Sequence, residues 1–243
     1  MIKILRNIRR KLLLGENLNT RFIGYVVYAI GEIFLVVIGI LIALQINNWN
    51  NERIQQEEAA KTYHNIKIQI IDDATELKKV REFNAYFSGQ YAKANEIIKT
   101  KDRSKSDSLA IIAMVLSQNS NFHRSGNIYE TLVNSGELKL LKNEEVTRNL
   151  QKLEMTYNRI NELEEVHWDI IMNELSPELK GVISYADLTI NKPEKLFSIE
   201  LQNIFIESIF LTKGKEAIYD QALKEIDTLV VLIDEELDQP KGP

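Results

Sequence analysis

The feature that most constrains this chain is an uninterrupted apolar run near its N-terminus. From Phe22 to Leu44 the sequence reads FIGYVVYAIGEIFLVVIGILIAL, and Glu32 is its only charged residue. As a helix that rises about 1.5 Å per residue, the run would measure about 34 Å, against a bilayer hydrocarbon core of about 30 Å. The run therefore predicts a transmembrane helix, which we place at residues 22–46.

A buried helix of a soluble protein and a cleaved signal peptide are the alternatives. A signal peptide has an apolar core of only about 7–15 residues and a small-residue cleavage site. The run is longer than that, and the following ALQINNW contains no A-x-A pattern. We therefore expect an anchor that stays attached to the protein.

The basic flank of the run predicts its orientation. Residues 1–21 contain six Lys or Arg and one acidic residue, a net charge of +5, whereas NNWNNERIQQEE after the run has one Arg and three Glu. The positive-inside rule places such a basic flank in the cytoplasm. Residues 47–243 are then an extramembrane domain on the other side. A basic arm can also bind nucleic acid, but the apolar run directly after it favours a membrane, and we expect no nucleic-acid partner.

The tail at 1–21 is also predicted to be amphipathic. In MIKILRNIRRKLLL, Ile2, Leu5, Ile8 and Leu12 share one helical face. A short helix on the anionic cytoplasmic leaflet would use the basic residues for contact. An unstructured basic tail is the alternative. The basic residues expected at the membrane surface are Lys3, Arg6, Arg9, Arg10 and Lys11.

Glu32 predicts that the transmembrane helix contacts another helix. A carboxylate within a span is costly unless it faces protein or water. Glu32 shares a helical stripe with Val36, Gly39 and Ala43, and the last two form a small-x-x-x-small pair that permits close helix approach. We expect self-association or another membrane protein here; snorkelling of the carboxylate to the surface is the alternative. At the two interfaces, we expect Tyr28 and Trp49 to act as anchors.

Apolar residues in the rest of the chain recur at helical steps of three, four or seven, and no useful stretch alternates as a strand. The pattern predicts an all-α fold, an elongated antiparallel helical bundle behind the one transmembrane helix. Asn127 and Asn143 are expected to cap helices, with Gly136 after the first of these. Pro177 is expected to end the helix that opens at Asn143, and Gly214 is a candidate interruption of a later one.

No set of residues predicts a catalytic, cofactor or metal site. The chain has no cysteine and three histidines, and it lacks the G-x-S-x-G, P-loop and dinucleotide glycine patterns. Glu164-x-x-His167 has the spacing found in di-iron bundles, but those sites need two such pairs. His123-Arg124 in the loop NSNFHRSG has the charge to bind an anion, although a solvated loop is the simpler interpretation. We expect no enzyme.

Two segments resemble an uncharacterised family of short bacterial inner-membrane proteins. These are YAIGEIFLVVIGILIALQINNWN at 28–50 and IYETLVNSGELKLLKNEEVTRNL at 128–150. The resemblance implies that Glu32, Gln45, Asn47, Asn48 and Trp49 belong to a family pattern, and it implies no activity. With the positive-inside rule, it places the chain in the inner membrane with its C-terminal domain in the periplasm.

These observations favour a membrane-anchored interaction or scaffold protein, an oligomer or a subunit of an inner-membrane assembly in contact with the lipid bilayer. The alternative is a periplasmic ligand-sensing bundle that signals through a membrane partner. A ligand pocket lined by Tyr157, Trp168 or Tyr219 would favour sensing, whereas a closed apolar core would favour a scaffold.

Overall fold

The structure is a computed structural model that describes residues 18–238, and it divides into two compact units, Met1–Glu58 and Ala59–Pro243. In the first unit, the described residues form the N-terminal part of helix α2, which runs from Leu18 to Thr100. No proline precedes Pro177, so no proline breaks this helix, and its longest stretch without glycine lies between Gly39 and Gly89.

The second unit contains the rest of α2 and the remaining elements, and it is helical throughout. Within residues 18–238 there is no strand, only one isolated antiparallel bridge between Ile183 and Ile190. The predicted all-α class is therefore confirmed. After α2 the elements are η1 (Arg103–Lys105), α3 (Ser106–Val115), α4 (Ile128–Ser135), η2 (Glu137–Leu140), α5 (Glu144–Ile170), η3 (Ile171–Leu175), α6 (Ser176–Lys180), η4 (Lys195–Phe197) and α7 (Ile199–Asp238).

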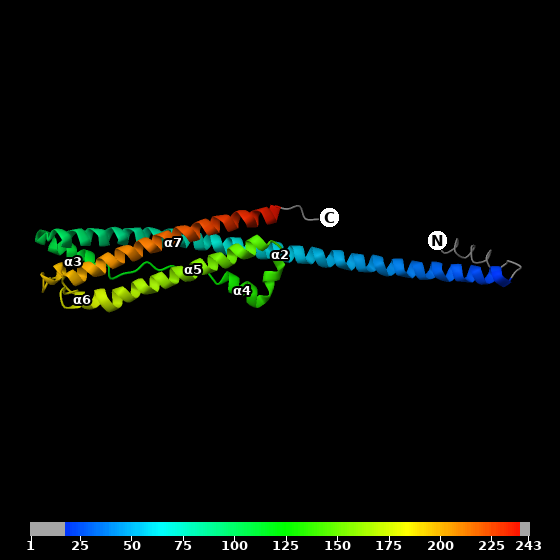
Figure 1. The fold of residues 1–243 in the computed structure, drawn as a ribbon, viewed down its shortest axis with the longest axis horizontal. Helices are drawn as coiled ribbons and strands as arrows, with labels where there is room; N and C mark the ends of the chain where they lie inside the picture. The colour runs from blue at the N-terminus through cyan, green and yellow to red at the C-terminus, as the bar shows by residue number, and fades with distance from the viewer. Residues whose placement is uncertain (1–17, 239–243) are drawn as a thin grey trace. The chain divides into compact units, whose positions relative to one another are not determined.

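Helix α7 lies antiparallel beside α2 in this unit (Figure 1). Lys67 forms an ion pair with Asp234, and Arg81 forms one with Asp220 at 2.6 Å between Nε and Oδ1. Residues later on α2 thus contact residues earlier on α7, as in an antiparallel pair. The same is true of α5 and α7, where Lys152 lies 3.3 Å from Glu225 and Glu164, later on α5, bonds to Tyr219, earlier on α7.

Helix α5, in contrast, runs parallel to α2. Tyr157 of α5 bonds to Asp73 of α2, and His167 bonds to Tyr91 farther along both helices. The prediction of antiparallel neighbours is therefore wrong for this pair. The reason is that residues 101–143 return along the two helices before α5 begins, a course that helical periodicity does not encode.

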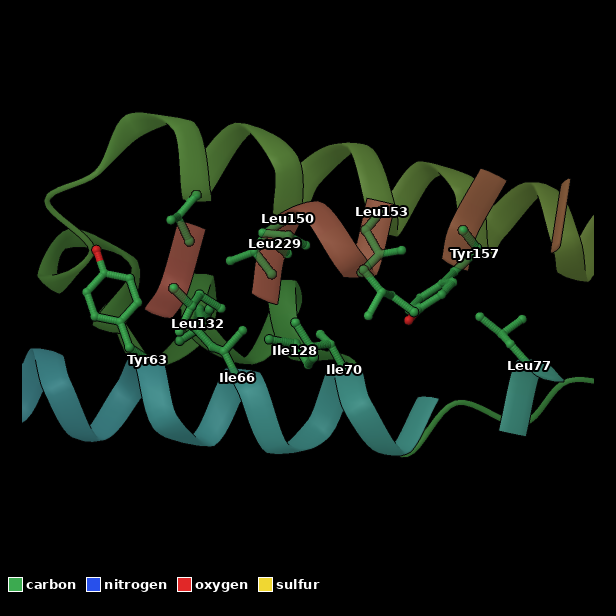
Figure 2. Packing of buried hydrophobic residues seen from close by; sticks show 14 of the residues in the cluster. Tyr63, Ile66, Ile70, Leu77, Ile128, Leu132, Leu150, Leu153, Tyr157 and Leu229 are labelled. Atoms are coloured by element: carbon green, nitrogen blue, oxygen red, sulfur yellow. The ribbon is translucent and has the colours of Figure 1, made fainter. Parts of the chain in front are cut away.

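Two apolar clusters fill the second unit. The first is built from α2, α4, α5 and α7, whose side chains interdigitate in Figure 2. The second lies around α3, η3 and α6, at the other end of the long helices. Apart from the adjacent pair Ile97 and Ile98, their members on α2 recur at steps of three, four or seven, which places them on one face of the helix. Those of α2 are Ala59, Tyr63, Ile66, Ile70, Leu77, Val80, Phe87, Tyr91, Ala94, Ile97 and Ile98.

The predicted helix ends are partly confirmed. Asn127 and Asn143 cap α4 and α5 with their side chains, and Gly136 adopts the left-handed conformation, φ +74°, after α4. Pro177 does not end a helix, because it lies in the first turn of α6, where the amide hydrogen it lacks has no helical partner. Gly214 does not interrupt α7, which continues to Asp238.

Candidate functional site

A loop without regular structure, residues 117–127, connects α3 to α4 and carries the sequence SQNSNFHRSGN. Its backbone has no strand partner, so its amide groups need other acceptors. Acidic side chains on α2 and α5 supply acceptors for two of these amides, and a further acid on α5 pairs with Arg124 of the loop. The anchors are Asp73, Glu154 and Glu164.

Glu164 of α5 is a buried anchor, with 3% of its surface exposed. Its two carboxylate oxygens accept the Phe122 amide hydrogen, at nitrogen–oxygen distances of 3.0 and 3.1 Å. The Tyr219 hydroxyl of α7 donates to Oε1 at 2.5 Å. Burial raises the pKa of Glu164, while these hydrogen bonds oppose the increase. Glu164 thereby joins the loop to both α5 and α7.

Asp73 and Glu154 hold the next part of the loop. The Asp73 Oδ1 atom accepts hydrogen bonds from the Ser125 amide at 2.7 Å and the Ser125 hydroxyl at 2.6 Å. The Tyr157 hydroxyl donates to Asp73 Oδ2 at 3.1 Å. Arg124 Nη1 donates to both oxygens of Glu154, at 2.7 and 2.8 Å. The conformation of the loop is therefore fixed by charged groups on two helices.

The buried end of the loop meets Lys215 of α7. The Lys215 Nζ atom donates to Asn119 Oδ1 and Ser120 Oγ, both at 2.8 Å, and its side chain is fully buried. Burial lowers the pKa of Lys215 to about 8, and the nearby Glu164 charge opposes that decrease. Lys215 is thus a buried cation whose ammonium group donates hydrogen bonds to two side chains of the loop.

His167 and Tyr91 form a second buried contact, with 3.1 Å between Nε2 and the hydroxyl oxygen. The Tyr91 hydroxyl also donates to the Leu116 carbonyl at 3.3 Å. Because a hydroxyl has one proton, both bonds form together when the His167 Nε2–H donates to Tyr91. Burial and then the Lys215 charge lower the pKa of His167 to about 3, so the imidazole is neutral at neutral pH.

Glu164, His167 and Lys215 form a polar layer between the two apolar clusters, together with Asn84 of α2, whose side-chain amide donates to the Thr212 carbonyl of α7 at 2.7 Å. Along α2 the layer falls between Val80 of the first cluster and Phe87 of the second, and it falls between Ile160 of α5 and Ile171 of η3. Polar residues at core positions cost stability but specify which residues face one another. The polar layer comprises Asn84, Glu164, His167, Thr212 and Lys215.

A cleft of about 690 Å³ opens beside the loop. One wall is the loop, and the other is a stripe of α5 formed by Asn161, Glu165 and Trp168, which are spaced four and three residues apart. Glu164 lies at the buried side of the cleft. The volume is within the range of about 300–1,000 Å³ that is usual for ligand pockets. The lining residues are Asn119, Asn121, Phe122, His123, Arg124, Asn161, Glu164, Glu165 and Trp168.

The sequence model of one family, described as a family of unknown function (DUF6090), matches residues 32–214. The chain belongs to the DUF6090 family. No curated protein and no solved structure matches it. The matched range contains the loop, its three acidic anchors and the cleft, and it stops one residue before Lys215. The resemblance drawn from the sequence is thus confirmed as membership of a family of unknown function, whose description states no activity and no location.

In this DUF6090 protein, the residues predicted at a transmembrane interface lie on α2 in the first unit. Glu32, Val36, Gly39 and Ala43 are all exposed, and no described atom comes within 4 Å of a Cβ built on Gly39, beyond its own helix. Their role in an interface stays a prediction. The same holds for the anchor roles of Tyr28, which is half-buried, and Trp49, which is 53% exposed. The predicted surface residues Lys3, Arg6, Arg9, Arg10 and Lys11 lie outside the described residues.

The aromatic residues proposed as pocket markers divide between core and cleft. Tyr157 and Tyr219 are buried and donate to Asp73 and Glu164, so they belong to the core. Trp168 is 46% exposed and lines the cleft. The proposed criterion therefore does not separate a scaffold from a sensor, because this DUF6090 domain has both a closed apolar core and a cleft.

The Glu164-x-x-His167 pair has other partners than a metal ion. Glu164 accepts from Phe122 and Tyr219, and His167 bonds to Tyr91. In residues 18–238 no group of three His, Asp or Glu side chains is placed to hold a metal ion. The proposed anion site at His123-Arg124 is also altered, because Glu154 already neutralises Arg124.

Sequence reasoning missed Asp73 and Lys215, and a signal for both was present. The core positions of α2 around Asp73 are Ile70 and Leu77, three residues before and four after it. Lys215 lies four residues before the buried Tyr219. A charged residue in the apolar stripe of a helix is expected to have a buried partner. The sequence does not show which group that partner is, because the partners come from a distant loop.

Proposed function

We propose that this DUF6090 protein is a single-pass membrane protein whose helical unit, from Ala59 onward, forms protein contacts outside the cytoplasm. One observation carries the proposal. The most apolar 18-residue window of α2 has a mean hydropathy of 2.7, and none of it is buried by the rest of the chain. Soluble monomers rarely expose apolar surface on that scale. A lipid bilayer would cover it, and the run at 22–44 has the length to cross one.

The proposed orientation follows from the flanking charges. With a net charge of +5 before the apolar run, the N-terminus would stay in the cytoplasm of a bacterium and the helical unit would enter the periplasm. The proposal includes no catalytic activity and no cofactor.

Paired fusions in a bacterial host test this topology. Alkaline phosphatase fused after Pro243 should be active, and a fluorescent protein that folds only in the cytoplasm should be dark at the same position. The matched control places both reporters after Glu16, before the apolar run, where the two results should be reversed. A dark phosphatase fusion and a bright fluorescent fusion after Pro243 would contradict the proposal.

The same proposal assigns the contact within the membrane to the stripe of Glu32, Val36, Gly39 and Ala43. Glu32 would receive a hydrogen bond from a neighbouring helix instead of facing lipid, where a central carboxylate is penalised by about 2.5–3.5 kcal/mol on insertion scales. Gly39 and Ala43 would allow the two backbones to approach. A second copy of the chain or another membrane protein fits this chemistry.

Ligand sensing is the second candidate, and the cleft favours it. The loop wall of the cleft is held in one conformation by Asp73, Glu154 and Glu164, as expected of a binding surface built on rigid supports. Asp73 also belongs to α2, the helix that carries the apolar run. In this candidate, a partner in the membrane would receive the signal.

A further inference from the structure

We infer that the cleft between the 117–127 loop and α5 binds a small organic cation, a protonated amine carried on an apolar chain. This inference rests on the second candidate function and names its ligand class. The first step is the charge of the cleft. The lining residues include two carboxylates, Glu164 and Glu165, and one permanent cation, Arg124, whose charge is matched by Glu154 at 2.7 Å. His123 is the remaining titratable group of the lining.

Glu165 is the acceptor that a ligand would find free. Its side chain is exposed, and it forms no hydrogen bond or ion pair with any described residue, whereas Glu164 already accepts from Phe122 and Tyr219. A positive ligand gains from the Glu165 charge, and an anion would be repelled by it, whereas the charge of Glu164 is already opposed by the buried Lys215. The neutralised Arg124 offers little compensation.

Trp168 supplies the apolar surface for the rest of the ligand. It follows Glu165 by three residues, so the indole and the carboxylate lie on the same stripe of α5. The indole is 46% exposed, and tryptophan is the best aromatic partner for an ammonium group. The other aromatic residue of the lining, Phe122, is buried and packs against Tyr157, with 5.2 Å between ring centres. The apolar contact is therefore assigned to Trp168.

The amide groups of the cleft complete the site. Asn121 and Asn161 are exposed on opposite walls, and their carbonyl oxygens can accept hydrogen bonds from an ammonium group that already pairs with Glu165. Because the loop is anchored by buried groups, little ordering is needed when a ligand binds.

The sequence allows a direct optical test. The chain has two tryptophans, so Trp49→Phe leaves Trp168 as the only one, and its emission reports on the cleft. The full chain in a non-ionic detergent would be titrated with 1,5-diaminopentane, with 1,5-pentanediol and with pentanedioate, which share one carbon chain and differ in charge. We expect a saturable change of emission with the diamine only. Binding should weaken as salt rises from about 0.01 to 0.15 M, which shortens the Debye length from about 30 to 8 Å.

Two variants in the same Trp49→Phe background locate the contact. Glu165→Gln should weaken diamine binding about fivefold, the effect expected of one partly exposed ion pair. Asp169→Asn removes the same charge one residue beyond Trp168 but outside the cleft, and it should leave the affinity unchanged. Equal weakening by both variants would show attraction to an acidic surface and would overturn the inference.

The remaining outcomes separate the inference from the function on which it rests. Saturable binding of pentanedioate without the diamine would overturn the cation assignment and leave ligand sensing in place. If the diol binds saturably and as strongly as the diamine, the positive charge of the ligand is not what the cleft recognises, and the inference is overturned. If none of the three probes changes the Trp168 emission in a saturable way, both the inference and the sensing candidate fail.

Discussion

Replacing Glu164 by leucine should destabilise the helical unit and release the loop. The substitution keeps a buried side chain of similar size, but it leaves the Phe122 amide and the Tyr219 hydroxyl without their acceptor. Each buried donor without a partner costs about 1–3 kcal/mol. Removing a carboxylate whose pKa is raised by burial returns part of that cost. We therefore expect a loss of about 2–4 kcal/mol, the lower part of the summed range.

The assay is thermal unfolding of the full chain in a non-ionic detergent, followed by far-UV circular dichroism. For a unit of this size, about 2–4 kcal/mol corresponds to a decrease in Tm of about 4–16 °C. Glu164→Gln keeps one oxygen as acceptor and should lose only about 1 kcal/mol. Glu165→Leu is the neighbouring exposed control and should stay within about 0.5 kcal/mol of the parent.

Hydrogen exchange at the Phe122 amide distinguishes this mechanism from general destabilisation. The amide should exchange much faster in Glu164→Leu, at temperatures where the helices of the unit remain protected. The reasoning is refuted if Glu164→Leu melts within about 2 °C of the parent, the shift expected for less than 1 kcal/mol. It is also refuted if the Phe122 amide keeps its protection.

Two further predictions concern the first unit and the polar layer. Gly39→Ile should reduce the amount of cross-linked or co-purified species. Gly31→Ile is the control, because this glycine lies on another face with equally open surroundings, and it should cause no reduction. If both variants form particles of the same size in detergent, snorkelling of Glu32 is favoured. The pKa of His167 is about 3 in the folded chain and ordinarily 6.5. Between these pH values the unfolded chain binds a proton that the folded chain does not. The free energy of unfolding should therefore fall as pH decreases from 6.5 toward 3. His167→Phe should reduce that slope by up to about 1.4 kcal/mol per pH unit in denaturant titrations, and an unchanged slope would contradict the assignment.

Local features of the fold could be predicted from the sequence. Asn127, Gly136 and Asn143 act through contacts within three residues, so their types and spacing were sufficient. The apolar stripes of α5 and α7 likewise follow from helical periodicity. The predicted helix end at Pro177 is wrong because proline is excluded from a helix interior but accepted in a first turn, and α6 starts at Ser176, directly after the π-helical segment η3.

The direction of α5 and the cleft could not be predicted in the same way. Both depend on the path of residues 101–143, and that path is set by contacts across 30 or more residues. Phe122 meets Glu164, and Ser125 meets Asp73, at separations of 42 and 52 residues. From a single sequence, helical periodicity predicts that a carboxylate occupies a core position. It does not predict which backbone amide donates to that carboxylate.

The acids that anchor the loop explain why the core of this unit is not uniformly apolar. An apolar residue at the position of Asp73 or Glu164 would pack as well, but it would offer no acceptor to the Ser125 and Phe122 amides, which have no helical or strand partner. A buried carboxylate adds little net stability, since its desolvation offsets much of the bond energy. Its effect is selective, because a loop shifted by one residue would leave the charge without its donors. Asp73 and Glu164 therefore fix the position of the loop against α2 and α5, and the position of the loop is what creates the cleft wall opposite Trp168.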